Sequence, residues 1–203
     1  MKLKFEILKE LKEHIPFTLA ATLLSVIIMS FLLLKENFIS YAVSMFYIFH
    51  PMHILFSSIV STAIFYNHTK KIIPAIIVSI FVSLFIGTLS DSILPYFGSS
   101  LFGIPISFHL PALENPILIF GASLVGASFG VLIRKTKFPH FLHVFISVFA
   151  SLLYIFAYST NFSMLTIFLI FIITSVSVII PCCLSDIVFP MIFQRRLKSK
   201  WFH

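Results

Sequence analysis

Four histidines form two pairs with the same spacing in this 203-residue chain. His50 and His53 open the stretch HPMHILFSSIVS, and His140 and His143 open the similar stretch HFLHVFISVFAS. On a helix, side chains three residues apart share a face, so both imidazoles of a pair can reach one ion. Imidazole is a common ligand of divalent transition metals. The two pairs are therefore candidate metal ligands.

Carboxylates and thiols accompany the histidine pairs. Asp91 lies in the sequence LSDSILP and Asp186 in LSDIVFP, while Cys182 and Cys183 shortly precede Asp186. Two imidazoles and a carboxylate suit Zn²⁺, Ni²⁺, Co²⁺ or Fe²⁺, and thiolates would shift the preference toward softer ions. The full set of candidate metal ligands is His50, His53, Asp91, His140, His143, Asp186, Cys182, Cys183, His109 and Glu114.

A row of serines continues each histidine pair. Ser57 and Ser61 follow His53 at four-residue steps, and Ser147 and Ser151 follow His143 in the same way. Such steps keep side chains on nearly one face of a helix. We therefore expect these four serines to line a polar path through an otherwise apolar segment.

The composition places these residues in a membrane protein. Hydrophobic residues make up 59% of the chain and charged residues 10%, and the mean hydropathy is +1.08. Apolar runs of about 18 or more residues are typical of membrane-spanning helices. Six such runs predict an all-α polytopic protein of the cell membrane, with helices near 17–34, 50–67, 72–91, 116–133, 140–159 and 163–193. The aromatic-rich segments 39–49 and 95–113 are expected to be interfacial or re-entrant.

The basic residues orient these six helices. All of them except Lys35 fall on one side, in the N-terminal segment, at Lys70 and Lys71, within 134–137 and in the C-terminal segment. Because basic residues are enriched on the inner side, both termini are expected to be cytoplasmic. The formal charge of +7 then reflects topology and contact with the lipid bilayer, and it does not indicate binding to nucleic acid.

The two halves of the chain match in three places. AATLLS at 20–25 resembles GASLVG at 121–126, the two histidine stretches match at a shift of 90, and LSDSILP at 89–95 resembles LSDIVFP at 184–190. Because each half has three helices, the second copy must lie inverted in the membrane. The chain is thus divided into an amphipathic cytoplasmic segment (1–16), a first repeat (17–95), an outer connection (96–115), an inverted second repeat (116–193) and a basic tail (194–203).

Inverted three-plus-three repeats are common in secondary transporters, whose sites lie where the repeats meet. In architecture alone, the predicted plan is similar to that of several six-helix cation exporter and permease groups. We expect a permease for a small cation, with the histidine pairs and their aspartates at opposite membrane surfaces and no organic cofactor. No Walker A pattern occurs in the sequence. A homo-oligomer is compatible with this pattern.

Two other functions fit parts of the sequence. The histidines could hold haem in a membrane redox protein, although their three-residue spacing favours a single ion. A His-x-x-His pair with an aspartate could also hold a catalytic metal in a membrane-embedded hydrolase, but neither H-E-x-x-H nor G-x-S-x-G occurs.

Overall fold

The computed structural model describes residues 2–32, 34, 37–133, 137–160 and 162–183, and this part of the chain is all-α. Its elements are α1 (Lys2–Leu32), α2 (Phe38–Thr69), α3 (Ile72–Thr88), the π-helical turn η1 (Leu89–Ile93), α4 (Leu94–Leu101), α5 (Pro111–Glu114), α6 (Pro116–Gly130), α7 (Lys137–Tyr158) and α8 (Met164–Cys183).

Three helical stretches are long and apolar enough to cross a membrane, namely Phe38–Asn67, Ile72–Leu101 and Met164–Cys182. Three shorter apolar helices accompany them, at Thr18–Leu32, Pro116–Gly130 and Leu142–Tyr158. Many large apolar side chains on the outside of the bundle are exposed, among them Phe81 and Phe85 of α3. This surface suits a hydrocarbon environment, where apolar side chains need no polar cover.

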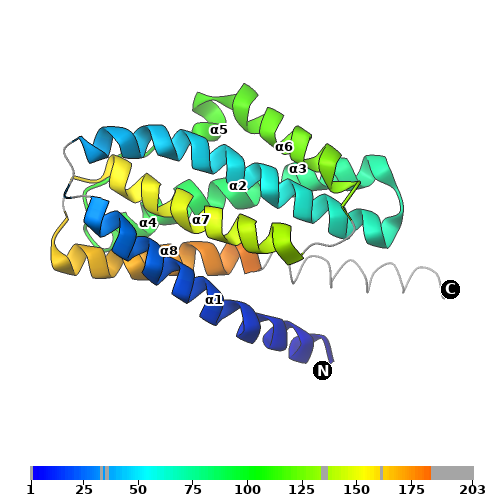
Figure 1. Cartoon of the computed structure of the whole chain (residues 1–203), viewed down its shortest axis with the longest axis horizontal. Helices are drawn as coiled ribbons and strands as arrows, with labels where there is room; N and C mark the ends of the chain where they lie inside the picture. Colours follow the sequence, from blue (N-terminus) through cyan, green and yellow to red (C-terminus); the bar gives the residue numbers. More distant parts are fainter. Residues whose placement is uncertain (1, 33, 35–36, 134–136, 161, 184–203) are drawn as a thin grey trace.

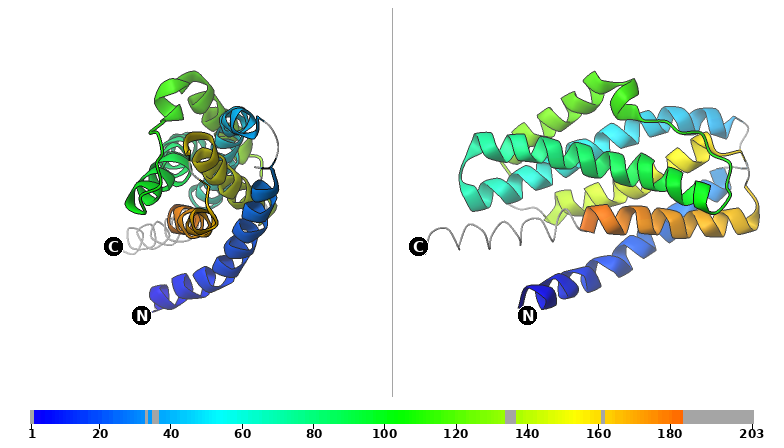
Figure 2. Two further views of the ribbon diagram at one scale, coloured as in Figure 1. Left: turned by 90° about the vertical axis from the view of Figure 1, so that its left-hand side faces the viewer. Right: turned by 180° about the vertical axis from the view of Figure 1, so that it is seen from behind.

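The long helices lie side by side in one bundle (Figure 1). α1, α3 and α7 run along the bundle in one direction, and α2, α6 and α8 run in the other, as the right-hand view of Figure 2 also shows. α2 is the central helix and packs against α3, α6 and α7, while α1 packs against α7 and α8. Because α2 and α7 run antiparallel, the serine rows that follow His53 and His143 extend in opposite directions along the bundle.

The segment 39–49 is not a separate element, because it forms the first part of α2. Pro51 therefore lies inside this helix and not near its start. Proline removes one backbone hydrogen bond, a loss that packed helices in a membrane tolerate. Packing explains the longer helix, since Ala42 and Phe46 are fully buried and the Phe38 ring meets Phe156 of α7 edge-on.

Two further helices are longer than the sequence predicted. The third helix continues past position 91 through η1 into α4 and ends at Leu101, so only part of the segment 95–113 is a connection. The N-terminal segment is helical as expected, but it is continuous with the first predicted span, and Pro16 lies inside α1. The tail 194–203 lies outside the described residues.

Close approach of α6 to α2 depends on two glycines. A Cβ atom at Gly126 would lie 2.1 Å from Ser58 Oγ and 2.2 Å from the Leu55 carbonyl oxygen. A Cβ atom at Gly130 would lie 2.6 Å from the carbonyl oxygen of Ile59. Small residues of this kind let membrane helices pack backbone to backbone.

Burial follows the same pattern in both halves of the chain. At a shift of 101, the buried residues Thr18, Thr22, Ser25, Val26 and Met29 of α1 correspond to the buried residues Ile119, Ser123, Gly126, Ala127 and Gly130 of α6. At a shift of 95, the buried residues Ala75, Ser79, Ile80 and Ser83 of α3 correspond to Ile170, Thr174, Ser175 and Val178 of α8. Matching residues of the two halves therefore face the core.

Candidate metal centre

His53 and His143 meet at the contact between α2 and α7. Their rings stack with centroids 5.2 Å apart and an angle of 5° between the planes, and both side chains are fully buried. His53 lies about 22 Å along the helix axis from Phe38, near the middle of α2. The antiparallel packing of α7 brings the matching histidine of the second half to the same level.

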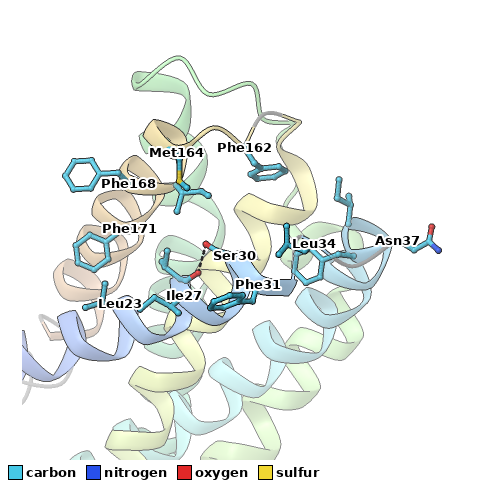
Figure 3. A pocket seen from close by; sticks show the side chains of 14 residues that line it. Leu23, Ile27, Ser30, Phe31, Leu34, Asn37, Phe162, Met164, Phe168 and Phe171 are labelled. Carbon is cyan, nitrogen blue, oxygen red and sulfur yellow. Dashed lines mark hydrogen bonds between the residues drawn. The ribbon is translucent and has the colours of Figure 1, made fainter.

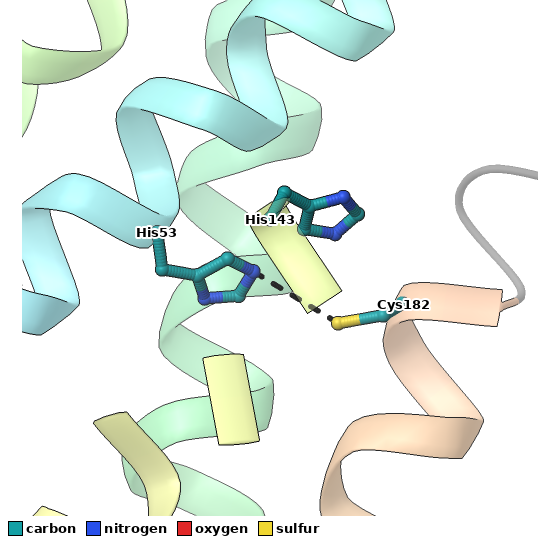
Figure 4. Close-up of side chains that lie close together, drawn as sticks. All are labelled: His53, His143 and Cys182. Carbon is teal, nitrogen blue, oxygen red and sulfur yellow. Dashed lines mark hydrogen bonds between the residues drawn. The ribbon is translucent and has the colours of Figure 1, made fainter. Parts of the chain in front are cut away.

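Cys182 of α8 completes a group of three potential ligands. Figure 4 shows His53, His143 and Cys182 converging from three different helices. Their ligand atoms all lie within 4.8 Å of one another, and Sγ of Cys182 lies 3.9 Å from Nε2 of His53. Bond lengths of about 2.0–2.3 Å to a Zn²⁺ ion place its ligand atoms less than about 4 Å apart. Small side-chain rotations would therefore let this group hold a metal ion.

Asp91 binds both histidines of the pair on α2. Its Oδ2 atom lies 2.9 Å from Nδ1 of His50 and 2.7 Å from Nδ1 of His53. An ionised carboxylate only accepts hydrogen bonds, so each imidazole donates from Nδ1. Nε2 of each ring then carries the lone pair that a metal ion requires. A carboxylate behind a histidine is a common device for orienting a metal ligand.

The π-helical turn places Asp91 in this position. In η1 the amide of Leu94 donates to the carbonyl of Leu89, five residues back, which widens the helix and shifts the following side chains around its axis. Such turns occur often at functional sites. Gly87, just before the turn, lets α3 approach α2, since a Cβ atom there would lie 2.7 Å from Ile54 Cγ1 and 3.8 Å from Nδ1 of His53.

Three hydroxyl groups satisfy the remaining polar atoms around Asp91. Its Oδ1 atom accepts hydrogen bonds from Ser90 at 2.7 Å and from Ser147 at 3.1 Å. Ser151 donates to the carbonyl of Ser90 at 2.9 Å. Ser147 Oγ also lies 3.5 Å from Sγ of Cys182. A fully buried carboxylate is costly unless it is hydrogen-bonded, and this network stabilises Asp91 inside the bundle.

The two histidine pairs do not lie at opposite surfaces as the sequence suggested, because His53 and His143 are in contact. The prediction placed His50 and His53 near the membrane surface because it began their helix at residue 50. In the structure α2 begins at Phe38, so both histidines lie well inside the helix. His50 and Asp91 join the same buried network. The side chains of His140 and Cys183, and Asp186 as a whole, lie outside the described residues.

The four predicted path serines are all buried, but they divide into two groups. Ser147 and Ser151 belong to the network around Asp91 and Ser90. Ser57 and Ser61 lie farther along α2, and the Ser57 hydroxyl has no hydrogen-bond partner within the described part of the chain. Ser90 was missed by sequence reasoning, although a serine precedes the aspartate in both LSD motifs and was an available signal.

His109 and Glu114 lie apart from this centre, near the end of the bundle where α2 begins. Nδ1 of His109 lies 3.1 Å from Oε1 of Glu114, and Tyr47 donates to the other carboxylate oxygen. Burial alone would raise the pKa of Glu114, but hydrogen bonds from Tyr47, the Leu110 amide and His109 together lower this pKa below its usual value. The His109 ring also stacks on Tyr158 of α7 at 4.0 Å.

A large cavity of about 1050 Å³ lies elsewhere, between α1 and α8 (Figure 3). Its lining includes Leu23, Ile27 and Phe31 of α1 and Phe168 and Phe171 of α8. No ionisable residue is among the lining residues that the structure describes. The cavity is therefore unsuited to an ion, and the polar network between α2, α7 and α8 is the better candidate site.

Comparisons of the chain with protein families, with curated proteins and with solved structures give no match. The chemistry of the buried group is thus the basis for a functional proposal.

Proposed function

We propose that the chain is a membrane permease for a divalent transition-metal ion, which binds between His53, His143 and Cys182. The observation that supports this best is the convergence of two imidazoles and one thiol from α2, α7 and α8 at a fully buried point. Nitrogen and sulfur ligands favour Zn²⁺ and similar ions over Mg²⁺ or Ca²⁺, which prefer oxygen.

The charges of the site also suit a doubly charged ion. The Asp91 carboxylate and a Cys182 thiolate would place two negative charges inside an apolar bundle. A divalent cation neutralises both, whereas either charge alone is expensive at this depth. Asp91 acts through His53, because its oxygens already accept hydrogen bonds from His50, His53, Ser90 and Ser147.

The packing supports an inverted repeat as the basis of transport. In an inverted repeat, α1, α2 and α3 would correspond to α6, α7 and α8. The contact between α1 and α8 would then have its counterpart between α6 and α3. Likewise, the contact between α1 and α7 would have its counterpart between α6 and α2. Both members of each pair are present. His53 and His143 match at a shift of 90 and meet between antiparallel helices, as residues close to a two-fold axis would. Sites of secondary transporters commonly lie at such a repeat interface.

Flux through the reconstituted protein tests this function. Purified protein in liposomes should move Zn²⁺ across the bilayer, and His53→Gln and His143→Gln should each abolish the flux because each removes one of three ligands. His68→Gln is the matched control, since it removes a histidine from the far end of the same helix and should leave flux unchanged. Undiminished flux in both ligand variants would contradict the proposal.

A further inference from the structure

His50 is buried and bound on one side only. It is fully buried, its Nδ1 is held by Asp91, and its Nε2 has no hydrogen-bond partner among the residues that the structure describes. A buried nitrogen without a partner costs free energy. His50 also does not belong to the group of three whose ligand atoms converge. An available nitrogen therefore lies one helical turn from the proposed metal site without taking part in it.

A continuous row of side chains joins His50 to the end of the bundle. The Phe46 ring stacks on the His50 ring at 5.5 Å and meets Tyr158 edge-on at 5.9 Å. Tyr158 in turn stacks on His109, whose side chain is 39% exposed. His109 thus lies at the surface, while Phe46 is fully buried between it and His50. Phe46 and Tyr158 therefore connect the exposed His109 with the buried His50.

We propose that His50 is a second binding position for the same ion, on a route from the His109 and Glu114 end of the bundle to the central site. This inference rests on the proposed function. An ion entering past Phe46 meets Nε2 of His50 first and then Nε2 of His53, three residues farther along the same face of α2. Asp91 serves both positions, since one oxygen atom fixes Nδ1 of both rings.

The route explains why one carboxylate holds two histidines. If Asp91 served the central site alone, one histidine would suffice, and a second imidazole with an unused nitrogen would only add a desolvation cost. At this first binding position, His50 replaces some of the water molecules bound to the ion. The ion then moves on to His53, His143 and Cys182. Phe46 lies between His50 and the exposed pair of His109 and Glu114, and it closes the route when no ion is bound.

Binding of Co²⁺ to the purified protein tests the two positions separately. A Co²⁺–thiolate absorption band reports arrival at Cys182. In His50→Gln the final band should equal that of the wild-type protein, but it should develop more slowly by about tenfold or more. His68→Gln should show the wild-type rate. An unchanged rate in His50→Gln, or loss of its final band, would overturn the second position.

A second variant reports on position 50 directly and does not depend on rates. In a Cys182→Ser, Cys183→Ser background, which should lack the band, His50→Cys should restore a Co²⁺–thiolate band because the new sulfur lies at the proposed second position. No band in this variant would overturn the inference while leaving the central site intact. If the wild-type protein itself gives no band, the central metal site fails and the route fails with it.

Discussion

At the residue scale, Asp91 connects the parts of the site. Its Oδ2 atom accepts hydrogen bonds from Nδ1 of His50 and of His53. Its Oδ1 atom accepts hydrogen bonds from the hydroxyl groups of Ser90 and Ser147. The carboxylate therefore fixes both the orientation and the protonated nitrogen of His53. In the proposed site Asp91 acts on the ion through the His53 ring, so its removal should weaken metal binding while leaving the three ligands in place.

Asp91→Asn should weaken Zn²⁺ binding by about 10- to 100-fold, the range found when a group that orients a metal ligand is lost. The amide oxygen is uncharged, and the amide nitrogen cannot accept the hydrogen bonds that Ser90 and Ser147 donate to Oδ1, so the amide holds the two imidazoles less firmly. Calorimetric titration of the purified protein measures the change. Ser92→Ala is the control, because Ser92 is equally buried nearby but has no hydrogen-bond partner among the described residues. Equal affinities in the two variants would contradict the role of Asp91.

Cys182→Ser should change which ion is preferred. Replacing the thiol by a hydroxyl removes the soft ligand and leaves two imidazoles, so binding of Cd²⁺ and Zn²⁺ should weaken more than binding of Mn²⁺. Competition titrations with the three ions measure the ratio. A ratio equal to that of the wild-type protein would show that Cys182 does not contact the ion.

The sequence predicted the identity of most site residues better than their positions. His50, His53, His143, Asp91 and Cys182 were all recognised, because ionisable groups are rare in apolar helices. The meeting of His50 and His53 with Asp91 was predicted, and the structure shows it. The convergence of this group with His143 and Cys182 was not predicted, since it depends on the true start of α2 and on the turn at η1. Phe46 was also missed, because a phenylalanine in an apolar helix carries no signal among 25 others of its kind.

At the element scale, the contact between α2 and α6 depends on the absence of side chains. Gly126 and Gly130 face backbone atoms of α2, whereas a Cβ atom at Gly121 would meet nothing within 4 Å. The three glycines on one helix therefore offer a matched comparison of packed and open positions.

Gly126→Ala should destabilise the protein by about 1–3 kcal/mol, the usual cost of overpacking. The new methyl group would overlap the Leu55 carbonyl oxygen, which cannot move without shifting α2. Gly121→Ala should be neutral or slightly stabilising, because alanine favours the helix and the space is open. Unfolding of both variants in mild detergent measures the difference, and equal stability of the two would argue against this packing.

The connection between α4 and α6 is held against the bundle by Glu114. Because hydrogen bonds lower the pKa of this carboxyl in the folded protein, its stabilising effect is present above the ordinary pKa of 4.5 and is lost as the pH falls through the lower folded value. Glu114→Gln should therefore reduce thermal stability at pH 7, and the gap to the wild-type protein should narrow below about pH 4.5. Melting curves over this pH range measure the gap. A constant gap would contradict the role of the charge.

The sequence predicted which segments are helical better than it predicted where the helices begin and end. The six apolar helices were located, but α2 was begun twelve residues late because Pro51 resembles a helix start. Proline is tolerated inside a helix that neighbours support, and such support is not visible in a pattern of residues. The same holds for α3, whose continuation through η1 depends on packing around Asp91.

At the scale of the whole molecule, the proposed route needs a fixed orientation of the bundle in the membrane. The connection between α2 and α3 carries Lys70 and Lys71, and it lies at the opposite end of the bundle from the segment that holds Phe108 and His109 (Figure 1). Basic residues at the first end should keep it on the cytoplasmic side. The route past His50 then begins at the outer surface.

Labelling of intact cells should distinguish the two ends. Phe108→Cys should react with an impermeant maleimide, because Phe108 is 51% exposed at the predicted outer end. Lys70→Cys, also exposed, should react only after the cells are opened. Reaction of Lys70→Cys from outside would reverse the orientation and with it the direction of the route.

The central claim is that one transition-metal ion binds between α2, α7 and α8. X-ray absorption spectroscopy of the Zn²⁺-loaded protein tests it most directly, because the first coordination shell reports the type of each ligand. The account predicts two imidazole nitrogens at about 2.0 Å and one sulfur at about 2.3 Å, with the sulfur absent in Cys182→Ser. A shell of oxygen ligands alone, or a shell unchanged in Cys182→Ser, would contradict it.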